Sequence, residues 1–438
     1  MPHPVKPMVP SRTRPSWWLA AVVVLLTLSI FTGCRRGKVR PAPLPQRTYV
    51  WQREWNPQVS QAVDRSRADL AGYVMLACEI EWRNGKPNPV RTKIDWQVAR
   101  SKTNSFSPAI RVMPYPGPFS EVDETATFLC NEARRQVAEI RAAGIEPNEL
   151  QLDFDCAQKK LAGYAMWVRA VRRTIVPLPL VITALPCWLD EADFPNLVRE
   201  ASSYVVQVHS VVSPRGDEHT MVCDPALARS WVERASRIGV PFEISLPTYR
   251  TLTGYDGTGR KLGSYSDAVR PSWPQGTTVR EYATDLDAMA ALVASWQATP
   301  PTHCKGLLWY RLPVDGERNN CSWPALRSMM QGRAPARSTT IHVNGKQPDE
   351  MPVSLADISL VNTGETDSPS FAGVTVKWDE PANLSAAEPL PGWRVIRDDH
   401  KTTFRPVDST MRLTPGSERA IGWMRFEKPA ILHVQALP

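Results

Sequence analysis

The chain has 438 residues, of which 42% are hydrophobic and 22% are charged, a composition that is ordinary for a soluble globular protein. This composition excludes a largely disordered chain, and the length leaves room for a large domain and a smaller one. The formal net charge is +8 at pH 7, but five basic residues crowd residues 35–47, so the charge does not indicate a nucleic-acid surface.

The N-terminal segment resembles a bacterial export signal. Three basic residues precede the apolar run WWLAAVVVLLTLSIF at residues 17–31. A membrane-spanning helix needs about 20 apolar residues, so this shorter run is typical of a cleavable signal peptide. The residues FTGC that end at Cys34 resemble the lipobox of type II signal peptides, although Phe31 stands where Leu is usual. We expect residues 1–33 to be removed and Cys34 to be lipidated. The alternative is an uncleaved anchor with an incidental cysteine.

Residues 34–47 form a predicted tether between the lipid and the folded part. Three prolines favour an extended chain of about 3.1 Å per residue, and the basic residues suit an anionic lipid surface. Arg35 follows Cys34, so the aspartate that marks inner-membrane retention in enteric bacteria is missing. We therefore expect a lipid-anchored protein of the cell envelope, held at the outer membrane and facing the periplasm or the cell surface.

Seven further cysteines lie in a chain that we expect to be exported to a compartment where disulfides form. The number is odd, so at least one thiol stays free or pairs between chains. Cys304 and Cys321 flank one predicted strand and loop and are the preferred pair, whereas most of the others lie in apolar patterns typical of buried thiols. No CxxC or His-rich spacing is present, so we expect no metal and no cofactor.

Residues 48–333 show eight short apolar or alternating runs, several of them followed by a helical pattern. Eight such units in about 285 residues predict an α/β fold of the (β/α)8 TIM-barrel type. Residues 86–107 are the weak part of the pattern because they show no clear helix. The strand candidates are residues 49–51, 73–81, 109–115, 150–155, 178–185, 204–211, 241–246 and 306–312, and the helical patterns are residues 58–70, 121–143, 158–175, 195–202, 225–238 and 279–297.

The pattern changes after a short linker. Residues 338–438 contain six short alternating runs separated by Gly, Pro, Asn and Asp, with no helical period. This arrangement predicts a small all-β domain of the sandwich type. Such domains are often packing or binding partners of a barrel, and the sequence does not decide between these two roles.

The fourth predicted strand ends in two aspartates at alternate positions, Asp153 and Asp155. Alternation along a strand puts them on one face and Leu152 and Phe154 on the other. In a barrel the apolar pair would face the helices. The acids would then point into the mouth, where the active sites of barrel enzymes lie.

The same alternation predicts further polar and aromatic side chains on the inner face or at the rim of the other strands. A barrel interior is normally filled by Val, Ile and Leu, and burying charges costs more than apolar filling, so such a ring favours a ligand site. The alternative is a network of buried ion pairs that only plugs the barrel, for example Arg311 with Asp153. The predicted ring consists of Glu79, Glu81, Arg111, Tyr115, Asp153, Asp155, Gln207, His209, Glu243, Tyr249, Trp309 and Arg311.

Three segments of the predicted barrel resemble an uncharacterised family of exported bacterial barrel proteins, filed as a domain of unknown function. They are LQLDFDC at residues 150–156, ITALP at residues 182–186 and LWYRLP at residues 308–313. That family is in turn similar to glycoside-hydrolase barrels. The resemblance implies a TIM-type barrel and a carbohydrate ligand.

The acidic strand also resembles the D-x-D-x-E motif of family 18 chitinases. Asp153 and Asp155 match the two aspartates, but Ala157 stands where the catalytic glutamate of the motif would be. The chitinase mechanism is therefore not carried over. A proton donor would have to come from another strand, and Glu79, Glu81 and Glu243 are the available choices.

Glycoside hydrolysis ordinarily uses two carboxyls, about 5 Å apart for retention of configuration and about 6.5 to 9.5 Å apart for inversion. We expect Asp155 to be the nucleophile or base and Glu243 the acid, with Asp153 and Arg311 tuning their charge. The other members of the ring would bind a polysaccharide or peptidoglycan, with aromatic side chains stacked on sugar rings. The alternative is a non-catalytic glycan-binding or scaffold lipoprotein whose barrel has lost its acid.

A long segment rich in Gly and Tyr, residues 248–275, follows the seventh predicted strand. Long loops in compact domains are usually functional or disordered, so we expect this segment to be a lid over the barrel mouth. Its GTGRK sequence lacks the strand and helix context of a phosphate-binding loop, so no nucleotide site is predicted.

Overall fold

The structure is a computed structural model that describes residues 1–5, 42–100, 104–209, 221–266, 272–348, 351–368, 372–379, 382–408 and 411–437. Most of the predicted signal peptide, Cys34 and most of the predicted tether lie outside these residues, as does part of the predicted lid. No helix within these ranges is both long and apolar enough to cross a membrane.

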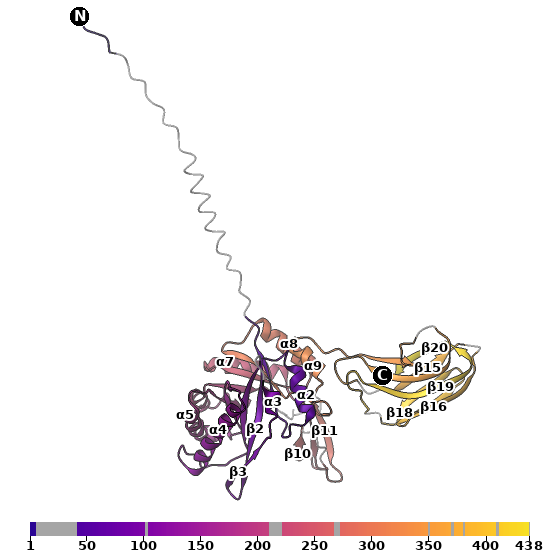
Figure 1. The fold of residues 1–438 in the computed structure, drawn as a ribbon, viewed down its shortest axis with the longest axis horizontal. Coiled ribbons are helices and arrows are strands. Elements are labelled where there is room, and N and C mark those ends of the chain that lie inside the picture. Colours follow the sequence, from indigo (N-terminus) through magenta and orange to yellow (C-terminus); the bar gives the residue numbers. More distant parts are fainter. Residues whose placement is uncertain are drawn as a thin grey trace. The chain divides into compact units, whose positions relative to one another are not determined.

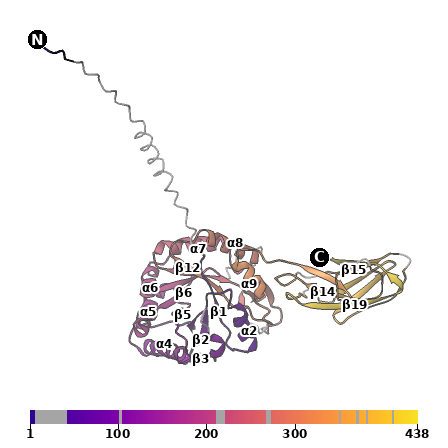
Figure 2. The same cartoon turned by 45° about the horizontal axis from the view of Figure 1, so that its top comes forward.

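Eight parallel strands close into a barrel, which confirms the predicted TIM-type fold (Figures 1 and 2). The first strand pairs with both the second and the last, and these two ladders close the ring. In order around the ring, the strands are β1 (Gln46–Val50), β2 (Gly72–Arg83), β4 (Ser105–Val112), β5 (Leu150–Phe154), β6 (Leu180–Ala184), β7 (Ser203–Gln207), β8 (Phe242–Pro247) and β12 (Cys304–Tyr310).

Helices follow the strands and surround the barrel, as Figure 2 shows. Six of them begin at an Asp, Asn or Ser whose side chain accepts a hydrogen bond from a backbone N–H group of the first turn. The helices are α2 (Pro57–Ser66), α3 (Trp96–Ala99), α4 (Glu124–Ala142), α5 (Leu161–Ile175), α6 (Phe194–Glu200), α7 (Pro225–Ile238), α8 (Leu286–Ala298) and α9 (Trp323–Met330), with two short 3-10 turns, η1 (Gln158–Lys160) and η2 (Pro186–Trp188).

Two parts of the barrel differ from the predicted pattern. Within the described residues of the weak part, the structure has β3 (Lys86–Arg91), which pairs antiparallel with β2, and the four-residue helix α3. The segment expected to be a loop contains β9 (Arg250–Tyr255) and β10 (Lys261–Tyr265), which form a three-stranded antiparallel sheet with β11 (Thr278–Ala283). The helix expected from residue 279 therefore begins only at Leu286.

Apolar side chains form one cluster inside the barrel and another between the strands and the helices. Leu152 and Phe154 belong to the outer cluster, in line with the predicted alternation on β5. On β12 the predicted alternation was wrong, because Leu308 belongs to the inner cluster and Trp309 to the outer one. The indole N–H of Trp309 donates a hydrogen bond to Oε1 of Gln46 at 2.9 Å, so this tryptophan is a buried packing residue.

The C-terminal part contains two four-stranded antiparallel sheets, in the orders β13-β14-β19-β16 and β17-β18-β15-β20 (Figure 1). Side chains of both sheets, including Ile358, Val376, Phe404 and Ile421, share one apolar core, as in a β-sandwich. The strands are β13 (Thr339–Val343), β14 (Val353–Asn362), β15 (Gly373–Trp378), β16 (Leu384–Pro389), β17 (Trp393–Asp398), β18 (Lys401–Pro406), β19 (Glu418–Ala430) and β20 (Leu432–Leu437).

The seven cysteines within the described ranges are free thiols, so the expected Cys304–Cys321 disulfide is not formed. Cys304 begins β12, whereas Cys321 follows the far end of that strand. A strand rises about 3.3 Å per residue, and a disulfide needs two Cα atoms within about 7 Å. The length of β12 therefore keeps the two thiols apart.

Candidate active site

A cavity of about 210 Å³ lies at the end of the barrel where the strands finish. This is the end at which barrel enzymes carry their active sites. One side of the cavity is polar and comes from β4 to β7, and the other is largely aromatic and comes from β1, β12 and the segment after β8. The lining residues are Tyr49, Trp51, Arg111, Asp153, Asp155, Thr183, Leu185, Gln207, His209, Ser245, Tyr249, Ser266 and Tyr310.

Asp153 lies on β5 and is held in place by its neighbours on the next two strands. The hydroxyl of Thr183 donates a hydrogen bond to Oδ1 of Asp153 at 2.6 Å, and Nε2 of Gln207 contacts the same oxygen at 3.5 Å. Its side chain is only 13% exposed. Burial and the nearby charge of Asp155 raise the pKa of Asp153 to about 6, against the opposing effect of Arg111.

Asp155 follows the end of β5 and is open to the cavity. No described residue forms a hydrogen bond or an ion pair with its carboxyl group. Desolvation raises the pKa of Asp155, and the charge of Arg111 opposes this shift. Asp155 is therefore the carboxyl of the pair that a bound molecule could contact.

Arg111 lies beside this pair on β4 and is shared between two carboxylates. Its Nε is 3.8 Å from Oδ2 of Asp153, and its Nη1 is 3.9 Å from Oε1 of Glu79 on β2. Glu79 is buried and is also paired with Arg53, which follows β1. The charged side chains thus alternate in sign across this side of the barrel.

His209 is the centre of a second polar group in the cavity. Its two ring nitrogens contact the hydroxyl of Tyr249 at 3.2 Å and the hydroxyl of Ser245 at 3.3 Å, and its ring stacks on Tyr310 at a centroid distance of 5.5 Å. Burial lowers the pKa of His209 to about 4. The imidazole is therefore neutral at physiological pH, and one nitrogen donates a hydrogen bond while the other accepts.

Three aromatic residues of the cavity were not predicted as site residues. Tyr49 and Trp51 come from β1 and the residue just after it, and Tyr310 ends β12. Their rings pack edge to face, with centroids 5.1 to 5.7 Å apart. The alternation of Tyr49 and Trp51 around Val50 was the available signal for the first two. Tyr310 was not predicted because the alternation on β12 was assigned to the wrong face.

Glu243 does not join Asp153 and Asp155. It is the second residue of β8 and lies near the start of the strand, whereas the cavity residue Ser245 is two positions further along. Glu243 forms an ion pair with Arg47, which also contacts Glu149 at 2.8 Å. These three residues line an open cleft of about 1000 Å³ at the opposite end of the barrel, so the expected role of Glu243 as the catalytic acid has no support in the geometry.

The structure also places five other predicted site residues outside the cavity lining, one of which is Glu79, buried on β2 beside Arg111. Glu81 lies on the protruding β2–β3 hairpin and pairs with Arg83 at 3.4 Å. Tyr115 packs in an aromatic cluster with Trp82, Phe119 and Trp167. Trp309 faces the helices, and the buried Arg311 pairs with Glu317 at 3.5 Å rather than with Asp153.

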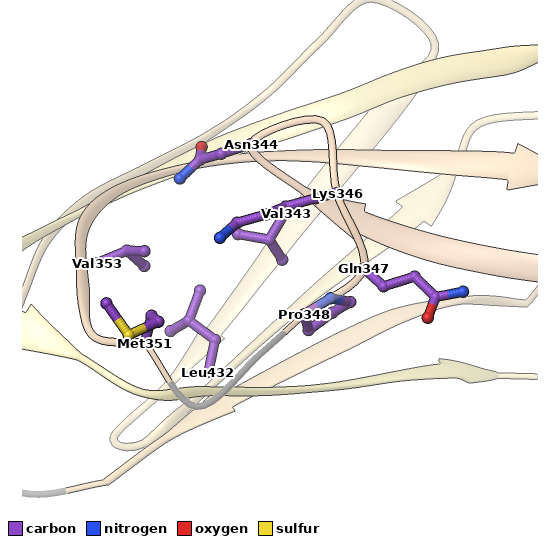
Figure 3. A pocket seen from close by; sticks show the side chains of 8 residues that line it. All are labelled: Val343, Asn344, Lys346, Gln347, Pro348, Met351, Val353 and Leu432. Atoms are coloured by element: carbon purple, nitrogen blue, oxygen red, sulfur yellow. The ribbon is translucent and has the colours of Figure 1, made fainter.

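A second hollow lies in the β domain, beside the turn after β13. Figure 3 shows the apolar side chains of Val343, Met351, Val353 and Leu432 around it. Its volume is about 20 Å³, which is room for about one water molecule. The barrel cavity is therefore the better candidate for a ligand site.

The described residues of the cavity are not grouped as metal ligands. Within the described part of the chain, no three side chains of the types His, Cys, Asp and Glu come together to bind a metal ion. The groups that face the cavity are instead hydroxyls, an amide, a guanidinium, an imidazole and two carboxyls. They can exchange hydrogen bonds with a polar ligand, and the carboxyls can exchange protons.

Several solved structures are similar to this chain at low identity. The spore cortex-lytic enzyme SleL of Bacillus cereus is 12% identical with a TM-score of 0.45, and the match covers 66% of this chain and 74% of that one. A chitinase of Chromobacterium violaceum is 13% identical with a TM-score of 0.45, covering 66% and 98%. The Group IV chitinase of Ostrinia furnacalis is 9% identical with a TM-score of 0.42, covering 66% and 98%.

Comparison by sequence gives a match to one family. No curated protein matches this chain. Residues 105–315 match the family model described as "Domain of unknown function (DUF3142)". These residues run from β4 to the segment after β12 and include both aspartates of β5. Over residues 105–315, the barrel of this chain is therefore similar to the DUF3142 family.

Proposed function

We propose that the barrel binds a glycan in the cavity and hydrolyses a glycosidic bond, with Asp155 as the group that exchanges a proton with the substrate. The observation that carries this proposal is the placement of Asp155, open to the cavity, beside the buried Asp153. Two neighbouring carboxyls with raised pKa values lose their protons one after the other, so the pair passes through a state with one proton. General acid–base catalysis needs a group, here a carboxyl, that can take up and release a proton.

The other lining residues suit a sugar. Trp51, Tyr249 and Tyr310 offer aromatic faces or edges for the apolar side of a pyranose ring. Across the cavity, Arg111 and Gln207 offer N–H donors and Thr183 offers a hydroxyl to the ring substituents. The cavity volume of about 210 Å³ is about that of one or two sugar rings, so a longer chain would extend beyond it.

The second candidate function is glycan binding without hydrolysis. It is favoured by the origin of both cavity carboxyls from one strand, because the two carboxyls of a typical glycosidase flank the scissile bond. Glu243, the expected partner from another strand, lies at the other end of the barrel. Ala157 stands where the chitinase motif would have its glutamate, and this difference also favours binding without hydrolysis.

One experiment distinguishes these two functions. The full-length protein in detergent would be incubated with peptidoglycan and with a panel of polysaccharides, and released reducing ends would be measured. We expect release by the native protein and at least a 100-fold lower rate for Asp155→Asn, as is usual when a general acid–base is lost. Glu81→Gln, which changes a carboxyl on the exposed hairpin, is the matched control and should keep the native rate.

Other outcomes lead to different conclusions. Equal release by Asp155→Asn would remove Asp155 from the catalytic role. Binding of a polysaccharide without any release of reducing ends would favour the non-catalytic function.

We also propose that the protein is anchored to the outer membrane by a lipid on Cys34, where an envelope polymer would be its ligand. This proposal is supported by the sequence alone: the short apolar run, the residues FTGC before and at the cleavage point, and Arg35 after it. The basic, proline-rich segment that follows suits a position next to anionic lipid.

A further inference from the structure

A row of charged side chains crosses the barrel mouth beside Asp153. Arg53 pairs with Glu79, with its Nη2 3.1 Å from Oε1, and Glu79 contacts Arg111, which in turn contacts Asp153. Three elements contribute to this row on one side of Asp153: the segment after β1, β2 and β4. On the other side of Asp153, Thr183 and Gln207 provide neutral hydrogen bonds.

The distances show that Arg111 does not form a close ion pair with Asp153. Its two carboxylate contacts measure 3.8 Å and 3.9 Å, and both are longer than a hydrogen bond. Glu79 itself is fixed, because its side chain is 7% exposed and its carboxylate accepts hydrogen bonds from Arg53. A fixed carboxylate on β2 thus attracts the guanidinium away from the carboxyl on β5.

The groups around Asp153 can be followed element by element. They are Tyr49 on β1, Glu79 on β2, Arg111 on β4, Asp155 after β5, Tyr164 on α5, Thr183 on β6 and Gln207 on β7. Among the described residues around Asp153, Arg111 is the one cation, and its second contact is Glu79. A change at Glu79 that moves the Arg111 guanidinium would therefore change the positive charge that acts on Asp153.

We propose that Glu79 is a positioning residue that holds Arg111 between two carboxylates and so keeps Asp153 a weak acid. Without the charge of Glu79, Arg111 could close on Asp153 and stabilise its ionised form. The direct repulsion between the two carboxylates would also disappear, and both changes make Asp153 a stronger acid. The importance of this for catalysis rests on the proposed function, but the acidity of Asp153 can be measured without any substrate.

The test is a carbon-13 NMR titration of the Asp153 carboxyl in protein labelled at aspartate, with the resonance assigned by its loss in Asp153→Asn. We expect Glu79→Gln to lower the measured pKa of Asp153 by about one unit. Arg53→Gln is a milder variant, because Arg53 is 55% exposed. It frees Glu79 to attract Arg111 more strongly, so it should raise the same pKa.

The matched control is Glu132→Gln on α4. Glu132 is as buried as Glu79, with a side chain 3% exposed, and forms an ion pair with Arg91 at 2.6 Å outside the barrel. The Glu132→Gln substitution should leave the measured pKa of Asp153 at its native value. An equal shift in the control, or no shift in either Glu79→Gln or Arg53→Gln, would overturn the proposal.

The pH dependence of any hydrolysis gives a second readout. A limb of the pH–rate profile that moves to lower pH in Glu79→Gln, and not in Glu132→Gln, would connect the positioning role to catalysis. If the titration shifts as expected while the native protein releases no reducing ends, the role of Glu79 stands and the proposed hydrolysis fails. If hydrolysis occurs and the titration does not shift, the proposed hydrolysis stands and the positioning role of Glu79 fails.

Discussion

At the scale of single residues, Asp153 makes the stability of the protein depend on pH. Its pKa is about 6 in the folded chain and near 3.9 in the unfolded chain, so the folded state binds the proton more tightly. The stabilising effect of this proton is fully present below pH 3.9. It is lost as the pH rises to about 6, since the buried carboxyl must then ionise.

Replacing Asp153 by Asn should remove this pH dependence. We expect the free energy of unfolding of the native protein, relative to Asp153→Asn, to fall between pH 4 and pH 7 by on the order of 3 kcal/mol, which is the equivalent of about two pKa units. Urea unfolding at several pH values measures the difference. A difference that stays constant, or that grows with pH, would contradict the raised pKa of Asp153.

At the scale of the elements, alternation along a strand predicts which face a side chain occupies but not how far along the barrel axis it lies. Asp153, Gln207 and Glu243 were all expected on inner faces. Asp153 and Gln207 lie in the second half of short strands and reach the cavity, whereas Glu243 lies at the start of β8 and faces the other end. The position of a side chain along the barrel axis is fixed by the stagger of neighbouring strands, and no sequence pattern marks that position.

The starts of β1 and β8 and the residue before β5 contribute a largely buried ion cluster to the cleft at the other end of the barrel. Arg47 is the cation that Glu149 and Glu243 share, and its side chain is 10% exposed. We expect Arg47→Met to lower the free energy of unfolding by about 3 to 5 kcal/mol at pH 7, because two carboxylates lose their buried partner. The loss should be smaller at pH 4, where protonation removes the unpaired charges.

A surface pair provides the control for this prediction. Arg65 contacts Asp315 at 2.7 Å, but the aspartate is 69% exposed, so Arg65→Met should cost no more than about 1 kcal/mol. Denaturant unfolding of both variants measures the two effects. Equal losses in the two variants would show that the cluster at the barrel end is not important for stability.

At the scale of the whole molecule, the order of strands and helices was enough to predict the barrel and the β domain. The prediction failed where local patterns are weak. Residues 86–99 include a hairpin strand and a four-residue helix, and these elements are too short for a helical period to be visible. The sheet of β9 to β11 is rich in Gly and Tyr, and only its pairing within the fold distinguishes it from a loop.

The candidate site was predicted in part, and for a physical reason. Charged residues on the inner face of a barrel are rare, so Asp153, Asp155 and Arg111 were visible in the sequence. Tyr49, Trp51 and Tyr310 were not predicted. The alternation of Tyr49 and Trp51 around Val50 indicates one shared face, but an aromatic residue on that face looks the same in the sequence whether it packs in a core or lines a cavity. Trp309 is the reverse case, an aromatic residue expected in the site that packs against helices.

The proposed lipid anchor can be tested on the whole protein. In Cys34→Ser no thiol is available for acylation, so we expect the protein to lose acyl labelling and to leave the membrane fraction. The reason is quantitative, because each buried CH₂ group of an acyl chain contributes about 0.8 kcal/mol and the basic tether alone gives only reversible binding. Cys187→Ser is a control, since Cys187 is an exposed free thiol in the barrel domain. Membrane fractionation and acyl labelling that are unchanged in Cys34→Ser would refute lipidation at Cys34.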